Sequence, residues 1–448
     1  MKPDSKGLPQ QLGVLGSGVL IGLGIRMVQS VVLARVLGVA DFGKLASVVA
    51  FAAIAARVND MGLPNAAAYF FRRSPDCLRE LLHTIGYNFL WCLLASTALA
   101  LLSLRLPTPF AADLAASSWF LLGLVAYTAL TTPASILPVL VAGAGDYPGY
   151  VRLTNGFAAA QIGLVIGGCL ILGFRYQYVI AALALGQLLL IAGVLLYLRR
   201  HLARPHAPKL GARSIYSYGL RSQWGALMKL ISSRVDILIV GALMTSSDVG
   251  LYSLAVSLRD IGLLPQSVYG APLQNALIDR GKTSAGSDKT LVLGSLILQF
   301  GLSALLVLVA VFSLPYLIPL IYGSTFAAAS KPAALLFTSI VFLGPAAVCW
   351  ITFNAKGRPG LNSVVMTVAA IVAAGSTYLL SSRQGLYGAA GAVVLTSLVS
   401  LLLSLVLLGR LQSYRPSDLP VALRRASSTA LGFLRPLHRG TSAPRDAK

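Results

Sequence analysis

The chain has 448 residues, of which 56% are hydrophobic and only 11% are charged. A soluble protein of this length cannot bury so much apolar surface, so lipid must surround most of the chain. Lysine and arginine outnumber aspartate and glutamate by 36 to 14, but the sequence has no basic, aromatic-rich soluble segment that would bind nucleic acid.

Apolar runs long enough to cross a membrane follow one another along almost the whole sequence. A helix needs about 20 mostly apolar residues to cross the hydrocarbon layer, and continuous rather than alternating runs favour helices over a β-barrel. The runs predict twelve spans, at residues 12–37, 42–63, 81–104, 117–143, 151–173, 177–198, 215–243, 249–272, 290–320, 330–353, 361–381 and 386–410. The first run lacks a convincing small-residue cleavage site, so we expect a retained helix rather than a signal peptide.

Basic residues outside the spans are concentrated in alternate loops. The segment 199–213 and the residues after 410 hold many of them. Positive loops of membrane proteins stay in the cytoplasm, so both termini are predicted to be cytoplasmic. The sequence then divides into an N-terminal six-helix bundle at 1–198, a basic cytoplasmic linker at 199–213, a C-terminal six-helix bundle at 214–410 and a basic cytoplasmic tail at 411–448.

The two halves resemble each other at a constant shift. An Asp-Phe-Gly triplet ends at Gly43 and an Asp-Val-Gly triplet ends at Gly250, 207 residues later, and Pro138 and Pro345 are separated by the same number. Agreement in order and spacing indicates an internal repeat. Because each half has an even number of spans, the repeats must be parallel, which predicts two bundles around a central cavity.

Six basic residues lie inside the predicted spans and away from their ends. A cation at the middle of a membrane helix costs about 2.5–3.5 kcal/mol, so these residues must reach the interface, pair with acids or line a polar cavity. We predict that they line the cavity and bind the substrate: Arg26, Arg57, Arg221, Lys229, Arg234 and Arg259. The nearby acids are candidates for ion pairs or for coupling to an ion: Asp60, Asp236 and Asp260.

Helical spacing divides these charges into paired and unpaired groups. Arg57 and Asp60 are three residues apart, and Lys229 and Asp236 are seven apart, so each pair shares a face and can form an ion pair. Arg259 points about 100° away from its neighbour Asp260, which predicts pairing between helices.

Arg26 and Arg234 have no acid on the same face within a turn or two. When the first half is shifted by 207 residues, Arg26 corresponds to position 233, one residue from Arg234. The two arginines are therefore expected at nearly the same depth in the two halves. They are therefore the best candidates for free cations in the cavity.

No cofactor or metal is expected. The four cysteines have no paired spacing, which argues against disulfides and metal sites: Cys77, Cys92, Cys169 and Cys349. The four histidines lie in loops or at the ends of spans, so neither a metal site nor a proton relay built on them is expected: His83, His201, His206 and His438.

One stretch near the N-terminus resembles a known family. An apolar helix that ends in Leu33-Ala34-Arg35-Val36-Leu37-Gly38 leads into Asp41-Phe42-Gly43, and Asn59-Asp60-Met61-Gly62-Leu63 and Asn65-Ala66 follow. These residues and the duplicated twelve-span layout resemble the Wzx-type polysaccharide or O-antigen unit flippases of the multidrug/oligosaccharidyl-lipid/polysaccharide (MOP) exporter superfamily.

The resemblance implies an all-α, MATE/MOP-like integral membrane protein of the bacterial inner membrane that is a transporter and not an enzyme. Its substrate would be an undecaprenyl-pyrophosphate-linked oligosaccharide, which it would move to the periplasmic leaflet for surface polysaccharide biosynthesis. The resemblance also implies a monomer that contacts membrane lipids and works beside a polysaccharide polymerase and a chain-length regulator.

Three other functions stay open at this point. A lipid II flippase has similar chemistry but normally fourteen spans. A MATE-like drug/cation antiporter needs unpaired acids within its spans to hold cations, and here the cations outnumber the acids. A membrane glycan polymerase or ligase needs a large periplasmic loop with catalytic residues, whereas the longest outward loop predicted here, residues 105–116, is short.

Overall fold

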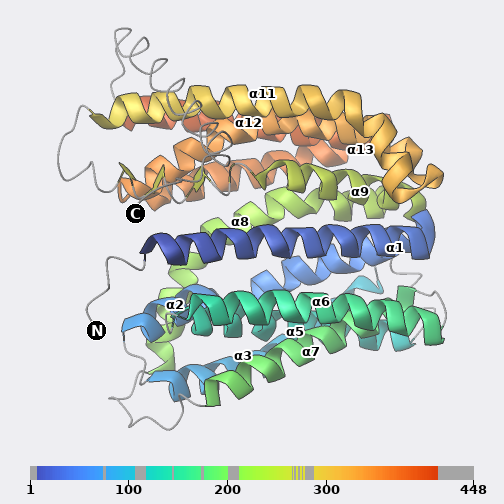
Figure 1. Cartoon of the computed structure of the whole chain (residues 1–448), viewed down its shortest axis with the longest axis vertical. Helices are drawn as coiled ribbons and strands as arrows, with labels where there is room; N and C mark the ends of the chain where they lie inside the picture. Colours follow the sequence, from blue (N-terminus) through green and yellow to red (C-terminus); the bar gives the residue numbers. More distant parts are fainter. Residues whose placement is uncertain are drawn as a thin grey trace, which may run out of the picture.

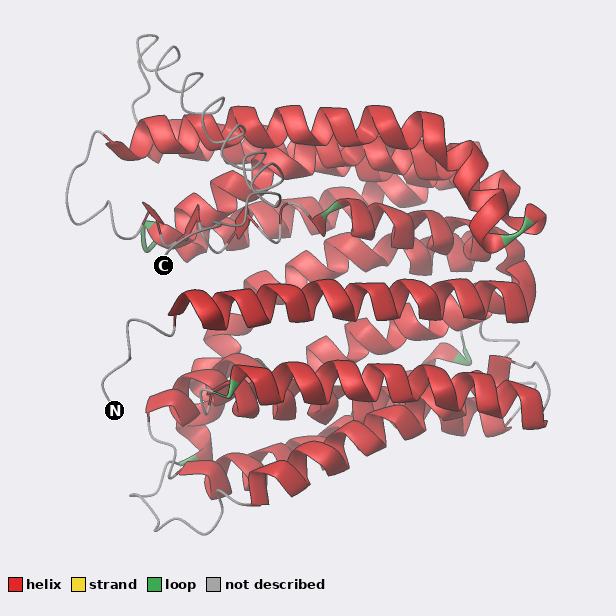
Figure 2. Ribbon diagram, viewed as in Figure 1, coloured by secondary structure: helices red, strands yellow, loops and turns green. Residues whose placement is uncertain are grey.

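The computed structural model describes residues 8–73, 77–105, 118–143, 146–172, 176–199, 211–264 and 287–411, together with a few residues between 266 and 277. The side chain of Arg221 and residues 412–448 lie outside this described part. All regular structure in the described residues is helical (Figure 2).

Every predicted span corresponds to a helix or to half of one. The helices are α1 (Leu8–Asn59), α2 (Leu63–Arg73), α3 (Leu78–Ser103), α5 (Ser118–Gly143), α6 (Tyr147–Leu172), α7 (Tyr176–Leu198), α8 (Ala212–Leu243), α9 (Ser246–Gly262), α11 (Ser287–Tyr322), the short 3₁₀ helix η3 (Ser324–Ala329), α12 (Ser330–Ala355) and α13 (Pro359–Leu411). The all-α prediction is confirmed.

Two of these helices, α1 and α13, each contain two predicted spans. In α1 the chain reverses at Gly38, with φ 71° and ψ 178°, and in α13 it reverses at Gly385, with φ 60° and ψ −139°. Glycine adopts positive φ without the steric cost that a Cβ would impose, so the reversal occurs at these residues. Figure 1 shows the first half of α1 crossing the molecule from left to right and its second half returning behind it.

The second predicted span ends earlier than expected. It was predicted to run to residue 63, but α1 ends at Asn59 and a tight turn follows, in which Met61 (φ 48°) and Gly62 (φ 73°) both have positive φ. The carboxylate of Asp60 stabilises this turn because its Oδ1 accepts a hydrogen bond from the Gly62 amide at 2.8 Å. The chain can therefore start the additional helix α2, which the sequence analysis did not predict.

Seven helical stretches of the described residues are long and apolar enough to cross a membrane. Those in α1 and α13 run through the glycine reversals. The predicted spans in α6, α8 and α9 are not among the seven: α9 has only 17 residues, and α8 carries Lys229, Arg234 and Asp236 along its middle.

The helices pack as two bundles. In one bundle α7 packs against α5 and α6, α3 packs against α5, and α1 packs against α6. In the other, α12 packs against α11 and α13, and α13 packs against α8. The main contact between the bundles is made by α1 and α9, and Figure 1 shows these two helices side by side at the centre of the molecule.

Equivalent glycines of the two repeats meet where α1 and α9 cross. A Cβ added to Gly43 would lie 1.9 Å from the Ser246 carbonyl oxygen, and one added to Gly250 would lie 2.1 Å from the Val39 carbonyl oxygen. These are the glycines of the two triplets that are 207 residues apart. Residues at one register position of parallel repeats are expected to meet at the axis that relates the repeats.

Further contacts join the bundles at both ends of this interface. Near the Gly38 reversal, the Arg35 guanidinium donates hydrogen bonds to the carbonyl oxygens of Ile321 (2.7 Å) and Leu320 (2.8 Å) in the last turn of α11. At the other end of α1, a Cβ on Gly62 would lie 2.0 Å from the Gly219 carbonyl oxygen of α8. Contacts to backbone carbonyl groups therefore join the two bundles at both ends of the space between them.

An alanine at Gly250 should open the contact near Gly38. Its methyl group would occupy the position of the Val39 carbonyl, so α1 and α9 would have to move apart. We expect spin labels at Ala40 and Ser247, in a background without native cysteines, to show a longer distance distribution in Gly250→Ala. Gly375→Ala is the control, because a Cβ there meets no atom within 4 Å. Unchanged distances in Gly250→Ala would show that this packing does not control the separation of the bundles.

Candidate functional site

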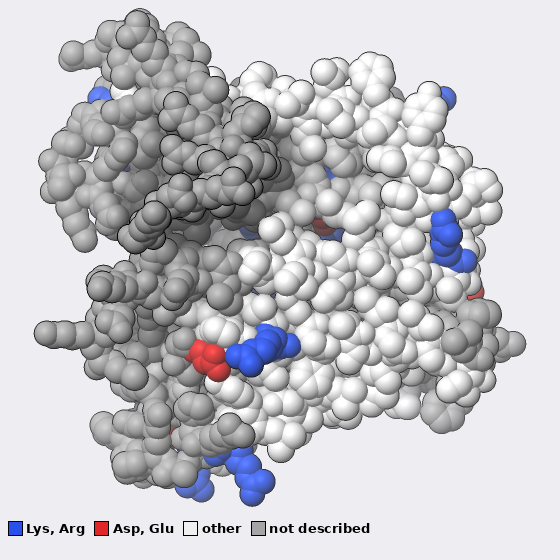
Figure 3. Space-filling model, in the orientation of Figure 1, with Lys and Arg blue, Asp and Glu red and all other residues white. Residues whose placement is uncertain are grey.

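A cavity of about 690 Å³ lies between the two bundles. Helices α1, α5, α6 and α7 form one side of it, and α8 and α9 contribute residues from the other bundle. Figure 3 shows basic and acidic side chains recessed between the apolar surfaces of the bundles. The polar residues that line the cavity include Arg26, Gln29, Tyr127, Thr131, Gln161, Gln187, Arg234, Ser253 and Ser257.

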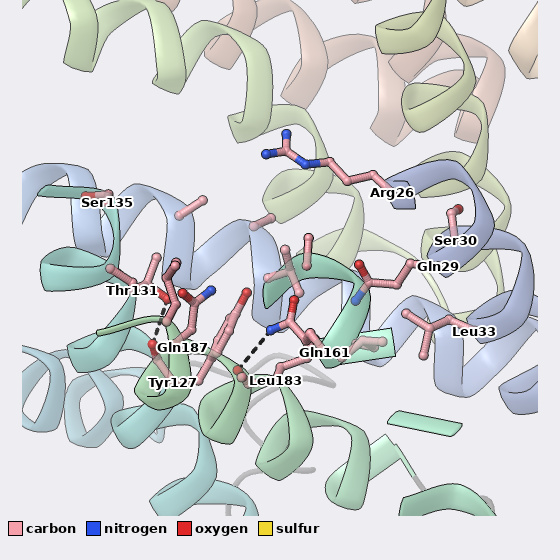
Figure 4. A pocket seen from close by; sticks show the side chains of 18 of the residues that line it. Arg26, Gln29, Ser30, Leu33, Tyr127, Thr131, Ser135, Gln161, Leu183 and Gln187 are labelled. Atoms are coloured by element: carbon pink, nitrogen blue, oxygen red, sulfur yellow. Dashed lines mark hydrogen bonds between the residues drawn. The ribbon is translucent and has the colours of Figure 1, made fainter. Parts of the chain in front are cut away.

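Arg26 of α1 is the free cation among the described residues that line this cavity. Its side chain is exposed, and it forms no ion pair with any carboxylate of the described residues. Figure 4 shows the guanidinium reaching from α1 into open space. A guanidinium presents several N–H donors in a fixed plane, so Arg26 can bind two oxygens of one phosphate or carboxylate group.

Arg234 also lines the cavity, but the prediction that it is unpaired is wrong. Its Nη2 atom lies 2.8 Å from Oδ2 of Asp260, and each side chain is 33% exposed. Spacing along one helix relates Arg234 only to acids of α8, whereas Asp260 belongs to α9. Arg234 therefore brings less uncompensated charge to the cavity than Arg26 does.

The expected separation of Arg259 from Asp260 is likewise not observed. The Arg259 guanidinium turns back along α9, and its Nη2 and Nε atoms lie 2.8 and 3.3 Å from Asp260 Oδ1. Four torsions in the arginine side chain allow this in spite of the 100° between adjacent residues of a helix. Asp260 thus binds two arginines, and the Arg259 side chain, 5% exposed, is not among the residues that line the cavity.

The predicted pair of Lys229 and Asp236 does not form. Seven residues of helix rise by about 10.5 Å, too far for direct contact. Asp236 is buried and accepts hydrogen bonds from the hydroxyl group of Tyr252 (2.8 Å) and from the amide of Ile237 (2.9 Å). Lys229 is exposed, with its Nζ atom 6.0 Å from the centre of the Trp350 ring, which is a cation–π geometry.

The predicted pair of Arg57 and Asp60 is present, with 2.8 Å between Nη1 and Oδ2. Asp60 Oδ1 also accepts a hydrogen bond from the Gln223 amide of α8 at 3.3 Å. This group lies where α1 meets α8, outside the cavity, so its contacts are those of a structural link between the bundles. Arg221 lies on α8, but its side chain is outside the described residues.

Of the six predicted cations, the structure brings Arg26 and Arg234 to the cavity. It also places several amides there that the sequence analysis did not select: Gln29, Gln161 and Gln187. A detectable signal existed, because each glutamine interrupts an apolar run, and polar groups at membrane depth tend to be functional. The described residues contain no group of histidine, cysteine and acidic side chains that would hold a metal ion.

Residues 8–278 match the model of a family described as polysaccharide biosynthesis protein. No curated protein matches the sequence. The structure is similar to that of a multidrug resistance MATE family transporter of the MOP superfamily in an inward-facing conformation, with a TM-score of 0.66, 14% identity and coverage of 92% of this chain and 99% of that chain.

Two further solved structures are similar. One is a MOP superfamily transporter from Pyrococcus furiosus, with a TM-score of 0.64, 15% identity and coverage of 90% of this chain and 95% of that chain. The other is the lipid II flippase MurJ in an inward closed conformation, with a TM-score of 0.63, 11% identity and coverage of 96% of this chain and 93% of that chain. At these identities the similarity shows the fold, a MATE/MOP arrangement of helices.

Proposed function

Because the chain belongs to the polysaccharide biosynthesis protein family, we propose that it is a flippase for undecaprenyl-pyrophosphate-linked oligosaccharide units, such as those of O-antigen. In this proposal it is a multi-pass inner-membrane protein with cytoplasmic termini, and it delivers its cargo to a polymerase and a chain-length regulator. The observation that carries the proposal is the guanidinium of Arg26, which lies in a cavity between the bundles without a carboxylate partner among the described residues.

The chemistry of the cargo matches this cavity in two ways. A pyrophosphate is a dense anion, and arginine binds phosphate oxygens through charge-assisted, bidentate hydrogen bonds. The polyprenyl chain is apolar, so it can stay in the lipid beside the bundles while the polar head group enters the cavity. A cavity that bound only a neutral glycan would not need a cation inside a predicted membrane span, where a charge costs about 2.5–3.5 kcal/mol.

The two arginines of the cavity also provide a route to alternating access. Arg26 belongs to one bundle and Arg234 to the other, so an anion held between them contacts both bundles. A ligand shifts a conformational equilibrium by its difference in affinity for the two states. We propose that the pyrophosphate favours the state in which the two bundles approach each other around it, and that the domains 1–198 and 214–410 rock as units.

Two competing functions fit the cavity less well. A drug/cation antiporter needs a carboxylate to hold its cargo, but none of the described residues that line the cavity is acidic. A glycan polymerase or ligase needs a general base to activate its acceptor, and the described residues of this lining include no histidine, cysteine, aspartate or glutamate that could act as one. A lipid II flippase would carry a similar anion, so an experiment must separate the two flippase functions.

Complementation in bacteria separates them. We expect the chain to restore surface polysaccharide, scored by gel electrophoresis, in a strain that lacks its oligosaccharide-unit flippase. We also expect it to fail to support growth when the lipid II flippase is depleted. Rescue of the depleted strain without restored surface polysaccharide would assign the lipid II function instead.

A further inference from the structure

The polar residues of the cavity are divided by charge between its two sides. Figure 4 shows the Arg26 side chain on one side and the side chains of Gln29, Gln161, Gln187 and Tyr127 gathered on the other. The second group comes from α1, α6, α7 and α5, so four helices of one bundle converge there. We call these four residues the amide cluster.

Within the amide cluster the side chains of Gln187 and Tyr127 interact with each other, but part of the hydrogen-bonding capacity of the cluster is not used by the described residues. Gln161 donates from Nε2 to the Leu183 carbonyl oxygen at 3.0 Å, which holds the side chain and leaves its Oε1 as an acceptor. Gly186 gives it room, since a Cβ there would lie 2.8 Å from Gln161 Nε2. The Gln29 amide has no hydrogen-bond partner in the described part of the chain. Unpaired polar groups in a low-dielectric site are costly, so they are expected to bind a ligand or water.

A second unpaired group faces the same cavity from the other bundle. Ser253 of α9 is only 4% exposed, and its hydroxyl group has no hydrogen-bond partner among the residues that the structure describes. Hydroxyl and amide groups can each donate and accept hydrogen bonds without carrying charge. The cavity therefore offers a set of neutral donors and acceptors, which is what the hydroxyl groups of a sugar require.

The distribution of charge restricts which sugar can bind. Arg26 and Arg234 are the only cations among the described residues that line the cavity, and Asp260 already pairs with Arg234. If the pyrophosphate occupies Arg26, the carboxylate of an acidic sugar would lie beside the amide cluster without a counter-charge. Burying an unpaired charge is strongly unfavourable, whereas a neutral hydroxyl group can be satisfied by amides.

We infer that the amide cluster is a binding site for an uncharged sugar of the lipid-linked cargo, so that the protein discriminates against acidic sugars at this position. This inference rests on the proposed function, since it assumes that the pyrophosphate binds at Arg26. It adds the chemical class of the sugar, which the family match does not give.

A pair of lipids that differ in one group tests the inference. Undecaprenyl pyrophosphate linked to glucose carries a CH₂OH group at carbon 6, and the same lipid linked to glucuronic acid carries a carboxylate there. We expect the full chain in nanodiscs to bind the glucose lipid at least about tenfold more tightly. Equal or tighter binding of the glucuronic acid lipid would overturn the inference and leave the proposed function intact. Absence of binding by both sugar lipids and by undecaprenyl pyrophosphate would overturn the proposed function itself.

Variants of the amide cluster test whether these residues bind the sugar of the glucose lipid. Gln161→Leu and Gln187→Leu keep the size of the side chain and remove its hydrogen bonds, so we expect each to weaken binding of the glucose lipid about five- to tenfold. Gly186→Ala should act in the same direction, because its methyl group displaces the Gln161 amide. Gln177→Leu is the matched control, since Gln177 lies in the first turn of α7 and does not line the cavity.

Binding of undecaprenyl pyrophosphate without a sugar distinguishes loss of the site from loss of the fold. We expect Gln161→Leu and Gln187→Leu to bind this lipid as the unmodified chain does, whereas Arg26→Ala should weaken binding of all three lipids. Unchanged binding of the glucose lipid by both glutamine variants would contradict the inference.

Discussion

Arg26→Ala is expected to reduce binding of undecaprenyl pyrophosphate by at least about 30-fold and to abolish measurable flipping. Removing one partner of a desolvated, hydrogen-bonded charge pair costs about 2–5 kcal/mol, and about 1.4 kcal/mol corresponds to a factor of ten in affinity. Among the described residues that line the cavity, no other cation can replace the lost group at low cost, because Arg234, the second arginine there, already binds Asp260.

Arg26→Lys should recover only part of this loss. Lysine restores the positive charge but not the planar pair of donors that fits a phosphate. Binding can be measured in nanodiscs and flipping in proteoliposomes, with Arg383→Ala as a control on the exposed surface of α13. If Arg26→Ala binds and flips as well as Arg383→Ala does, the cavity does not recognise the cargo through this guanidinium.

Asp260→Asn is expected to destabilise the protein more than any substitution of the residues that line the cavity. Asp260 is bound by Arg234 and by Arg259, and the Arg259 side chain is only 5% exposed. Leaving a buried charge without its partner costs about 3–5 kcal/mol, which is a large share of the total stability of a typical protein. We expect less of the variant protein to accumulate in the membrane. We also expect a lower melting temperature, measured as the loss of the folded peak in size-exclusion chromatography of heated samples.

A second substitution shows whether the loss of stability in Asp260→Asn comes from the unpaired charge of Arg259 or from changed packing. Arg259→Met in the Asp260→Asn background removes the buried cation that has lost Asp260 as its ion-pair partner, while it keeps an unbranched side chain. The buried Asp236 interacts electrostatically with both Arg259 and Arg234 and keeps Arg234 as a nearby cation, so we expect part of the stability to return. If the double variant is less stable than Asp260→Asn, Arg259 contributes through contacts other than its ion pair with Asp260. If Asp260→Asn alone is as stable as the unmodified chain, the network is not a structural element of α9.

Much of the fold follows from local features of the sequence. Apolar runs define the spans, because the thickness of the hydrocarbon layer sets the length of a helix. The two triplets that end at Gly43 and Gly250 revealed the repeat, and the structure packs those glycines against each other at the crossing of α1 and α9. The pair of Arg57 and Asp60 was also predictable, because a three-residue spacing lies within one turn of helix.

The residues that were misjudged depend on contacts between helices or on backbone geometry. The partner of Arg234 is Asp260 on another helix, and spacing along one helix contains no information about such a contact. The end of α1 depends on the turn at Met61 and Gly62, which an apolar run does not reveal. The amide cluster was not predicted because its glutamines are neutral, and only charged residues within the spans were taken as candidates for the site.

Transport by the purified chain would show whether the cavity of Arg26, the free guanidinium among the described lining residues, carries a lipid-linked pyrophosphate across the bilayer. Proteoliposomes would contain undecaprenyl pyrophosphate linked to a fluorescent neutral oligosaccharide, and a membrane-impermeant quencher would report the exposed fraction. The account predicts that the chain accelerates movement between leaflets and that Arg26→Ala returns the rate to that of protein-free liposomes. A rate equal to that of protein-free liposomes for the unmodified chain, or an unchanged rate for Arg26→Ala, would contradict it.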